Sequence, residues 1–251
     1  MNAPAALILA GSRGGIDPVA ADEGVSHKAL IAVGGQPMLA RVAEALRGAG
    51  IARIAVSADD PGVVALAGEL GLAVLPPAAG PSRSVTVALG ELGTPLIVTT
   101  ADHALLEPRW VIDFLADVPP GADVAVLLAE RAVVEAAMPG TRRTWLRFAD
   151  GAWSGCNLFY LATPQAARAI DLWRTVEADR KRPWRIVRRF GVGTLLRYIA
   201  GRLTLAEGVA RLGRTADVAA AAVPARAGLA AVDVDKAGDL ADVRAIIASR
   251  G

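Results

Sequence analysis

The sequence predicts an α/β fold, a Rossmann-like three-layer α/β/α arrangement around a mainly parallel sheet. The chain has 251 residues, of which 53% are hydrophobic, and a mean hydropathy of +0.41, so it can bury a large core and is not disordered. In its first half, short apolar runs alternate with stretches of helical periodicity. Short strands joined by helices need right-handed crossovers, which give a parallel sheet covered on both faces.

The elements of the first half follow from this alternation. Apolar runs predict strands at residues 5–10, 54–57, 72–75, 96–100 and 124–128. Apolar residues spaced for one face of a helix predict helices at residues 37–49, 61–70, 84–92 and 108–116. The polar stretch between the first strand and the first helix is expected to be a long loop.

The pattern changes after Gly140. Residues 144–148 and 157–161 are predicted strands, joined by a hairpin turn at Asp150 and Gly151. Residues 164–179 are predicted to be helical, and 184–212 to form two or three short amphipathic helices broken at Gly191, Gly201 and Gly208. Residues 229–234 are expected to return to the sheet before a closing helix at 238–248. We therefore predict one domain over residues 1–251, with an inserted basic helical subdomain at 164–217.

The charge of this insertion differs from that of the rest of the chain. The net charge is +2, yet the stretch from Arg168 to Arg214 holds twelve basic and four acidic residues. One interpretation is an insertion that packs its apolar side and leaves its arginines in solvent. The alternatives are contact of residues 180–202 with anionic lipid, or a clamp for a phosphorylated acceptor. A nucleic-acid role is disfavoured because no recognition module accompanies the basic stretch.

Composition also indicates a compartment. The sequence contains no run of eighteen or more apolar residues, the length needed to cross a bilayer. The first ten residues lack the basic start of a secretory signal. A single cysteine, Cys156, excludes an internal disulfide and a cysteine-rich metal site, and we interpret it as core packing. His27 and His103 do not have the spacing of a zinc site. We expect a soluble, cytoplasmic protein.

The loop after the first strand is the strongest functional signal. Residues 7–15, LILAGSRGG, leave a buried strand and enter a glycine-rich loop, where the backbone can approach an anion and donate amide hydrogens. The Gly-x-Gly-x-x-Gly spacing of dinucleotide enzymes is absent, which disfavours a nicotinamide-dependent oxidoreductase. The Gly-Lys-Ser/Thr ending of a Walker A loop is absent too. The loop predicts phosphate binding of another kind.

Four ordered motifs resemble a known family. The first comprises Leu9, Ala10, Gly11, Arg13, Lys28, Leu30, Gly35, Pro37, Met38 and Leu39. The second is GPSRSV at residues 80–85, the third is Asp102 directly after LIVTT, and the fourth is VDVDKAGDL at residues 232–240. In this order they resemble the nucleotidyltransferases related to molybdenum-cofactor guanylyltransferase and to sugar-phosphate and polyol-phosphate nucleotidyltransferases. The second motif is similar to the base-contacting segment of the cytidylyltransferase branch.

The resemblance implies roles for particular residues. Lys28 and Arg13 would be catalytic, neutralising the phosphates, and Asp102 with Asp233 or Asp235 would bind Mg²⁺. Asn157 would line the acceptor site. The implied nucleotide-binding residues are Leu9, Ala10, Gly11, Ser12, Gly14, Gly80, Arg83 and Ser84. Asp239 is instead expected to be a first-turn acid of the last helix, stabilised by the helix dipole.

The implied reaction explains these residue types. Attack of an acceptor phosphate on the α-phosphorus of a nucleoside triphosphate brings two anions together, so the site needs positive charge and positioning. Carboxylates are the hard oxygen ligands that Mg²⁺ prefers. The expected function is nucleotidyl transfer with release of pyrophosphate, with cytidylyl transfer in an envelope or lipid precursor pathway as our first choice. The alternatives are guanylyl transfer to a phosphorylated cofactor precursor, or a catalytically silent nucleotide-binding module.

Overall fold

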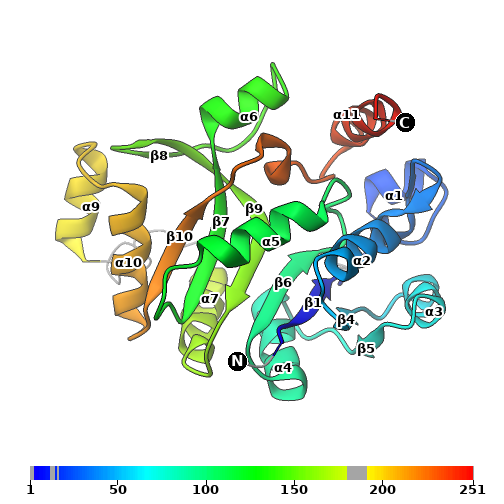
Figure 1. The fold of residues 1–251 in the computed structure, drawn as a ribbon, viewed down its shortest axis with the longest axis horizontal. Coiled ribbons are helices and arrows are strands. Elements are labelled where there is room, and N and C mark those ends of the chain that lie inside the picture. The colour runs from blue at the N-terminus through cyan, green and yellow to red at the C-terminus, as the bar shows by residue number, and fades with distance from the viewer. Residues whose placement is uncertain (1–2, 12–14, 16, 180–190, 251) are drawn as a thin grey trace. The chain divides into compact units, whose positions relative to one another are not determined.

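The structure is a computed structural model that describes residues 3–11, 15, 17–179 and 191–250. The fold is α/β, as predicted, with mainly parallel strands and flanking helices (Figure 1). The chain packs as two compact units, one formed by Met1–Asp113 with Val232–Gly251 and the other by Phe114–Ala231. Ser12, Arg13 and Gly14 of the predicted site lie outside the described residues.

The first unit is built on four parallel strands in the order β6-β1-β4-β5. These strands are β1 (Ala5–Leu9), β4 (Arg53–Ser57), β5 (Ala73–Leu75) and β6 (Leu96–Thr100). β1 is central and almost fully buried, which explains its unbroken apolar sequence. In the register, Leu9 lies between Ser57 and Thr100, so three strands end together at one edge of the sheet.

Helices follow the strands of this unit at nearly the predicted places. They are α2 (Met38–Gly48), α3 (Pro61–Glu69), α4 (Pro81–Leu92), α5 (Pro108–Asp117) and the closing α11 (Ala237–Ala248). Asp60 starts α3 by accepting a hydrogen bond from the Val63 amide at 3.0 Å. α4 begins three residues before its predicted start, because Pro81 occupies the first turn, where a missing amide hydrogen is not needed.

The predicted long loop between β1 and α2 contains structure that the sequence pattern did not reveal. It holds the short α1 (Pro18–Asp22), the 3₁₀ turn η1 (Lys28–Leu30) and a small hairpin of β2 (Ala32–Val33) and β3 (Gln36–Pro37). Asp17 caps α1 by accepting from the amides of Val19 and Ala20. These pieces are too short to show helical or strand periodicity, which is why the loop prediction was wrong.

The second unit has mixed pairing. β10 (Ala220–Pro224) runs parallel to β7 (Val124–Glu130), and β9 (Gly151–Leu161) runs antiparallel to both β7 and β8 (Leu146–Phe148). The predicted hairpin is confirmed, with Phe148 opposite Gly151. Its helices are α6 (Arg131–Ala137), α7 (Ala166–Asp179), α9 (Val192–Ile199) and α10 (Leu205–Thr215), followed by the 3₁₀ turn η2 (Gly228–Ala231).

Two element predictions in the last third of the chain are wrong. The expected strand at 229–234 is instead η2 and an irregular segment, and the strand that returns is β10. β10 has the sequence AAAVP. Because the chain around it is also rich in alanine, the strand does not stand out as a separate apolar run. Gly208 does not break a helix but lies inside α10, where a Cβ atom would come within 2.9 Å of the Phe148 ring. Small size at a close contact, and not helix termination, explains this glycine.

The predicted insertion can be followed only in part. α7, α9 and α10 lie within residues 164–217, whereas residues 180–190 lie outside the described residues. On α9, the side chains of Leu196 and Ile199 are exposed. Contact of residues 180–202 with anionic lipid stays a prediction. Among the helices within the described ranges, none is long and apolar enough to span a membrane.

Candidate active site

The candidate site lies in the first unit, where segments far apart in the sequence meet beyond the ends of β1 and β6. Asp102 follows β6 by two residues, Lys28 begins η1, and Asp235 precedes α11. Side chains at the carboxyl ends of parallel strands converge at one edge of the sheet, which is where α/β folds bind ligands.

The Lys28 ammonium joins these segments directly. Its Nζ donates a hydrogen bond of 2.9 Å to Asp102 Oδ2 and one of 2.8 Å to the Val234 carbonyl oxygen. It also lies 3.6 Å from Asp235 Oδ1. The side chains of Lys28 and Asp102 are each only 18% exposed, so this ion pair is shielded from solvent. The structure thus brings together Lys28, Asp102 and Asp235, while their roles stay predictions.

The electrostatics of the cluster favour positive charge. Burial alone would lower the pKa of Lys28, but the charge and hydrogen bond of Asp102, with the charges of Asp235 and Asp17, raise it overall. Partial desolvation and the charges of the Asp233, Asp102 and Asp239 carboxylates raise the pKa of Asp235, against the opposing effect of Lys28. One ammonium therefore neutralises the carboxylates only in part, and a further cation would be attracted.

The backbone beside the cluster is fixed on both sides. The Val234 amide donates to the Asp102 carbonyl oxygen at 3.1 Å, so residue 234 is tied to Asp102 as well as to Lys28. Asp239 Oδ2 accepts from the amides of Asp235 and Lys236 at 3.1 and 3.0 Å. Asp239 lies in the first turn of α11, as predicted. It therefore holds the backbone that carries Asp235.

The sequence left open whether Asp233 or Asp235 is the second metal ligand, and the two residues differ in their surroundings. Asp235 faces Lys28, and its side chain is 73% exposed. Asp233 is half-buried and acts on Asp235 through its charge. The structure therefore places the Asp235 carboxylate next to the ammonium that also pairs with Asp102.

The predicted nucleotide-binding segments are both in this unit, but several of their polar groups are already used. The Ala10 amide donates to the Ser57 carbonyl at 3.0 Å and continues the sheet, so it is not offered to a phosphate. Ser84 is buried, and its Oγ accepts from the Ala78 amide at 3.0 Å. A Cβ atom on Gly11 would lie 3.6 Å from Pro77 Cβ, which puts the glycine loop beside the segment that leads to α4.

The remaining predicted residues are placed as follows. Leu9 ends β1, Gly80 precedes α4, and Arg83 is exposed on its first turn. Asn157 lies in β9 of the second unit, with a positive φ of 49°, in the region where the β7–β9 register shifts. A bulge next to a functional residue is a known way to redirect a side chain.

Sequence reasoning missed two features of the site. The Val234 carbonyl is a partner of Lys28, but a backbone acceptor leaves no trace in residue type. Arg244 of α11 pairs with Glu23, which is 221 positions away, and only a folded chain shows that they meet.

A divalent ion fits the acidic side of the cluster. Asp102 Oδ1 is buried and has no hydrogen-bond partner within the described part of the chain. The same part of the chain contains no group of three or more His, Cys, Asp or Glu side chains arranged to hold a metal. Mg²⁺ is commonly held by one or two carboxylates together with substrate phosphates, so two carboxylates suffice for a site that is completed by a nucleotide.

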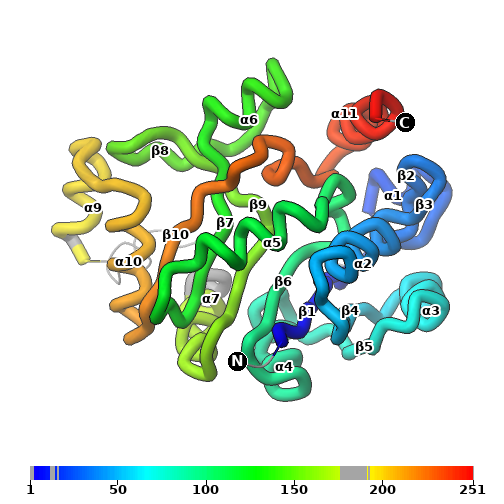
Figure 2. Tube along the Cα trace, viewed as in Figure 1, coloured from blue at the N-terminus to red at the C-terminus, as the bar shows by residue number. Residues whose placement is uncertain are grey.

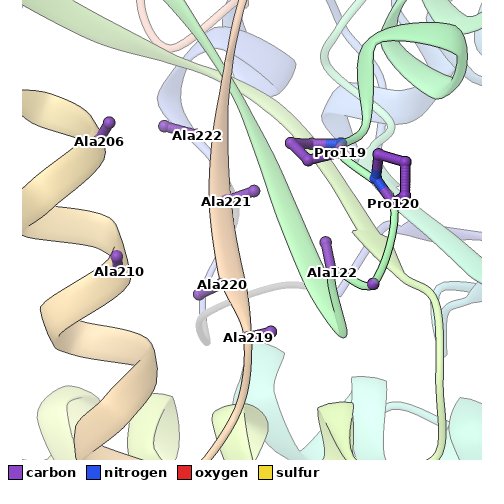
Figure 3. A pocket seen from close by; sticks show the side chains of 10 residues that line it. Pro119, Pro120, Ala122, Ala206, Ala210, Ala219, Ala220, Ala221 and Ala222 are labelled. Carbon is purple, nitrogen blue, oxygen red and sulfur yellow. The ribbon is translucent and has the colours of Figure 1, made fainter.

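The second unit contains a pocket of a different kind. It has a volume of about 350 Å³ and is lined by residues of α10, of β10 with the residue before it, and of segment 119–122 before β7 (Figure 3). Its lining consists of alanines, two prolines and a glycine, namely Pro119, Pro120, Gly121, Ala122, Ala206, Ala210, Ala219, Ala220, Ala221 and Ala222. These side chains offer no acid, base or nucleophile, so this pocket is not the site of chemistry.

Comparisons with known proteins cover most of the chain, including parts of both units. The family described as "MobA-like NTP transferase domain" matches residues 6–188. A hypothetical transferase from Thermus thermophilus is 34% identical, with a TM-score of 0.83 over 95% of this chain and 100% of that one. No curated protein matches in sequence.

Two further solved structures share the fold at low identity. The CTP:phosphocholine cytidylyltransferase of Streptococcus pneumoniae is 13% identical, with a TM-score of 0.59 over 98% of this chain and 100% of that one. The 2-C-methyl-D-erythritol 4-phosphate cytidylyltransferase of Thermus thermophilus is 16% identical, with a TM-score of 0.54 over the same shares.

Proposed function

We propose that this chain, which belongs to the MobA-like NTP transferase domain family, transfers a nucleotidyl group from a nucleoside triphosphate to a small phosphorylated acceptor. The observation that carries this proposal is the meeting of Lys28, Asp102 and Asp235 at the carboxyl edge of a parallel sheet. An acceptor phosphate oxygen would bond to the α-phosphorus while the bond to the bridging oxygen breaks, and pyrophosphate would leave. The step needs no covalent enzyme intermediate.

Mg²⁺ would be held by Asp102 and Asp235, with Asp102 Oδ1 as the free oxygen. When bound, the ion would supply positive charge to the phosphates as they approach one another. The chain's own residues would do the rest. Lys28 would exchange part of its contact with the carboxylates for contact with phosphate oxygens, and Arg13 would add a second cation. Gly11, Ser12 and Gly14 would approach the phosphates with their backbones.

We propose cytidylyl transfer as the specific reaction. The GPSRSV segment supports this choice, since Gly80 and Arg83 stand at the start of α4, where a base could be contacted. The two cytidylyltransferases that share the fold are consistent with it. Asn157 would line the acceptor site, and the acceptor would be a precursor of an envelope component or lipid, made in the cytoplasm. Guanylyl transfer to a phosphorylated cofactor precursor is the second candidate, because the matching family is named for MobA.

The first test is nucleotide preference. The protein is heated with each of the four triphosphates and Mg²⁺ while unfolding is followed, and we expect one base to raise the Tm more than the others. No stabilisation by any triphosphate would contradict the proposal, whereas stabilisation without pyrophosphate release for any acceptor would support the silent nucleotide-binding module. Pyrophosphate release is then measured with a panel of phosphorylated acceptors.

The second test removes the predicted metal ligand. We expect Asp102→Ala to lower kcat/KM by roughly a hundredfold or more, because charge developing at the phosphates would lose its counter-ion. Asp59→Asn, which changes an exposed carboxylate just after β4, is the matched control and should retain activity. Unchanged pyrophosphate release by Asp102→Ala would contradict the assigned role.

A further inference from the structure

One guanidinium fastens both ends of the segment that carries Lys28. Arg244 of α11 donates from Nη1 to Glu23 Oε1 at 2.8 Å and from Nη2 to Glu23 Oε2 at 2.5 Å. Its Nη2 also donates to the Ala32 carbonyl oxygen at 3.1 Å. Glu23 and Ala32 are the two ends of a stretch with Lys28 near its middle. The tube in Figure 2 shows α11 beside the end of α1 and β2.

The contact has the geometry of a strong ion pair. Two parallel hydrogen bonds between a guanidinium and a carboxylate fix orientation as well as distance, which a single lysine ammonium could not do. The hydrogen bond from Arg244 lowers the pKa of Glu23, and the same bond raises the pKa of Arg244. Both groups therefore stay charged across the neutral pH range.

The segment between these two ends has little regular structure of its own. Ser26 Oγ donates to Asp60 Oδ1 at 3.1 Å, and His27 Nδ1 accepts from the Ala29 amide at 3.0 Å to start the one turn of η1. Lys28 must nevertheless bring its ammonium to Asp102 and to the Val234 carbonyl on other segments. The placement of the segment's ends therefore controls where the ammonium can reach.

The same helix is also linked to Asp235, the carboxylate that faces Lys28. α11 starts two residues after Asp235, and Asp239 in its first turn holds the Asp235 amide. Arg244 lies further along that helix and holds the Lys28 segment. We propose that Arg244 is a positioning residue: through Glu23 and Ala32 it sets the Lys28 ammonium against Asp102 and Asp235. The catalytic consequence rests on the proposed function, while the positional claim does not.

The chain offers a matched control. Arg250, which follows α11, pairs with Glu107 Oε1 at 2.6 Å. The Arg250 and Glu107 side chains are 42% and 37% exposed, against 41% and 29% for Arg244 and Glu23. Arg250→Gln thus removes a surface ion pair of similar kind from the same end of the chain. Glu107 is not part of the Lys28 segment, so Arg250→Gln separates general loss of charge from loss of positioning.

The positional test uses the small number of lysines. The chain has only Lys28, Lys181 and Lys236, so trace acetylation of the folded full-length protein, read by peptide mass spectrometry, reports each amine separately. We expect Lys28 to react about threefold faster or more in Arg244→Gln than in the wild type, as its segment opens locally. Lys236 should keep its rate, and Arg250→Gln should change neither. An unchanged Lys28 rate, or an equal rise at all three lysines, would overturn the proposal.

A milder variant, Glu23→Gln, keeps the proposal testable if Arg244→Gln does not fold. Glu23→Gln leaves the Arg244 contact with Ala32 possible, and it should raise the Lys28 rate in the same direction. The double variant Glu23→Gln with Arg244→Gln should change the rate by less than the product of the two single changes, because both remove the same pair. Independent, multiplying effects would contradict a shared role.

Kinetics supply the second readout. Arg244→Gln should lower kcat by about tenfold with a smaller change in the KM for the triphosphate, since misplacement of a catalytic group acts on the chemical step. Arg244→Lys should restore only part of kcat, and Arg250→Gln should match the wild type. Loss of kcat equally in both Gln variants would overturn the positioning role. If the wild type itself transfers no nucleotide, the proposed function fails while the labelling result still decides the position of Lys28.

Discussion

At the residue scale, the Lys28 ammonium has three oxygen neighbours supplied by Asp102, Val234 and Asp235. This is the kind of surrounding that a metal ion would also find favourable, because all three groups offer oxygen to a cation. The lysine therefore stands where it would compete with a divalent ion for the carboxylates. Phosphate oxygens from a bound triphosphate would relieve that competition.

Lys28→Met is therefore predicted to bind Mn²⁺ more tightly than the wild type when no nucleotide is present. Removing one unit of positive charge beside two carboxylates should strengthen cation binding by about tenfold. Electron paramagnetic resonance of free Mn²⁺ during a titration measures the affinity. Lys236→Met, which removes an ammonium lying 4.0 Å from Asp239, is the control and should have a smaller effect. Weaker Mn²⁺ binding by Lys28→Met would contradict the competition.

Asp123 gives a residue-scale prediction about pH. Its carboxylate accepts from Thr163 Oγ1 at 2.5 Å and from the Ala219 amide at 2.8 Å, tying the start of β7 to the segments beside it. These hydrogen bonds lower the pKa of Asp123, so its stabilising effect is present above the usual aspartate pKa. The effect is lost as pH falls through the lower, folded-state value.

Asp123→Asn should destabilise the protein by about 1 kcal/mol at neutral pH, because an amide cannot accept both hydrogen bonds through two oxygens. The difference in Tm between the variant and the wild type should narrow as pH falls below about 4, the usual aspartate pKa, and should be lost once pH passes the lower pKa of the folded-state carboxyl. Thermal unfolding across a pH series measures it. A difference that stays constant down to strong acid would show that the charge of Asp123 is not the cause.

At the element scale, the sequence predicted best where burial is uniform. β1 and β6 are buried on both faces; β1 is an unbroken apolar run and β6 begins with Leu-Ile-Val, so their positions were correctly anticipated. β10 was missed because alanine has a low strand propensity and because the neighbouring sequence is equally rich in alanine, so the strand does not stand out. α1 and η1 were missed because one or two turns cannot display a helical period.

Glycines in α9 and α10 yield an element-scale prediction. A Cβ atom on Gly213 would lie 2.6 Å from Ala220 Cβ and 2.7 Å from the Val218 carbonyl oxygen, so helix and strand backbones could not keep their spacing. Gly213→Ala should lower stability by roughly 2 kcal/mol or more through overpacking. In α9, a Cβ atom on Gly193 would meet no atom of the described residues within 4 Å, so Gly193→Ala should be neutral or stabilising by up to about 1 kcal/mol. Denaturant unfolding of both variants checks this, and equal stabilities would contradict the close packing.

At the scale of the whole molecule, a site residue could be predicted where a local sequence motif marks it, and not where it depends on a distant partner. Asp102 and Lys28 could be predicted because each follows a recognisable strand or loop motif. The Val234 carbonyl and the Arg244 and Glu23 pair could not, since they depend on the spatial approach of residues more than two hundred positions apart. Contacts of that kind follow from the completed fold and not from any local pattern.

Metal removal gives a prediction for the whole molecule. The proposed Mg²⁺ site is completed by the phosphates of the nucleotide, so we expect the ion to bind together with the nucleotide and not to hold the fold. Adding EDTA should leave the Tm of the nucleotide-free protein unchanged, and should abolish most of the rise in Tm that the preferred triphosphate causes. Differential scanning fluorimetry with and without Mg²⁺ measures both. A large fall in the Tm of the nucleotide-free protein would reveal a structural metal instead.

The most direct measurement is a crystal structure with Mn²⁺ and a non-hydrolysable analogue of the preferred triphosphate. We predict an anomalous Mn²⁺ peak at about 2.2 Å from oxygens of Asp102 and Asp235 and from a phosphate oxygen. The Lys28 ammonium should then contact the phosphates. A peak elsewhere on the protein, or a triphosphate bound away from Lys28, would contradict the nucleotidyl-transfer site described above.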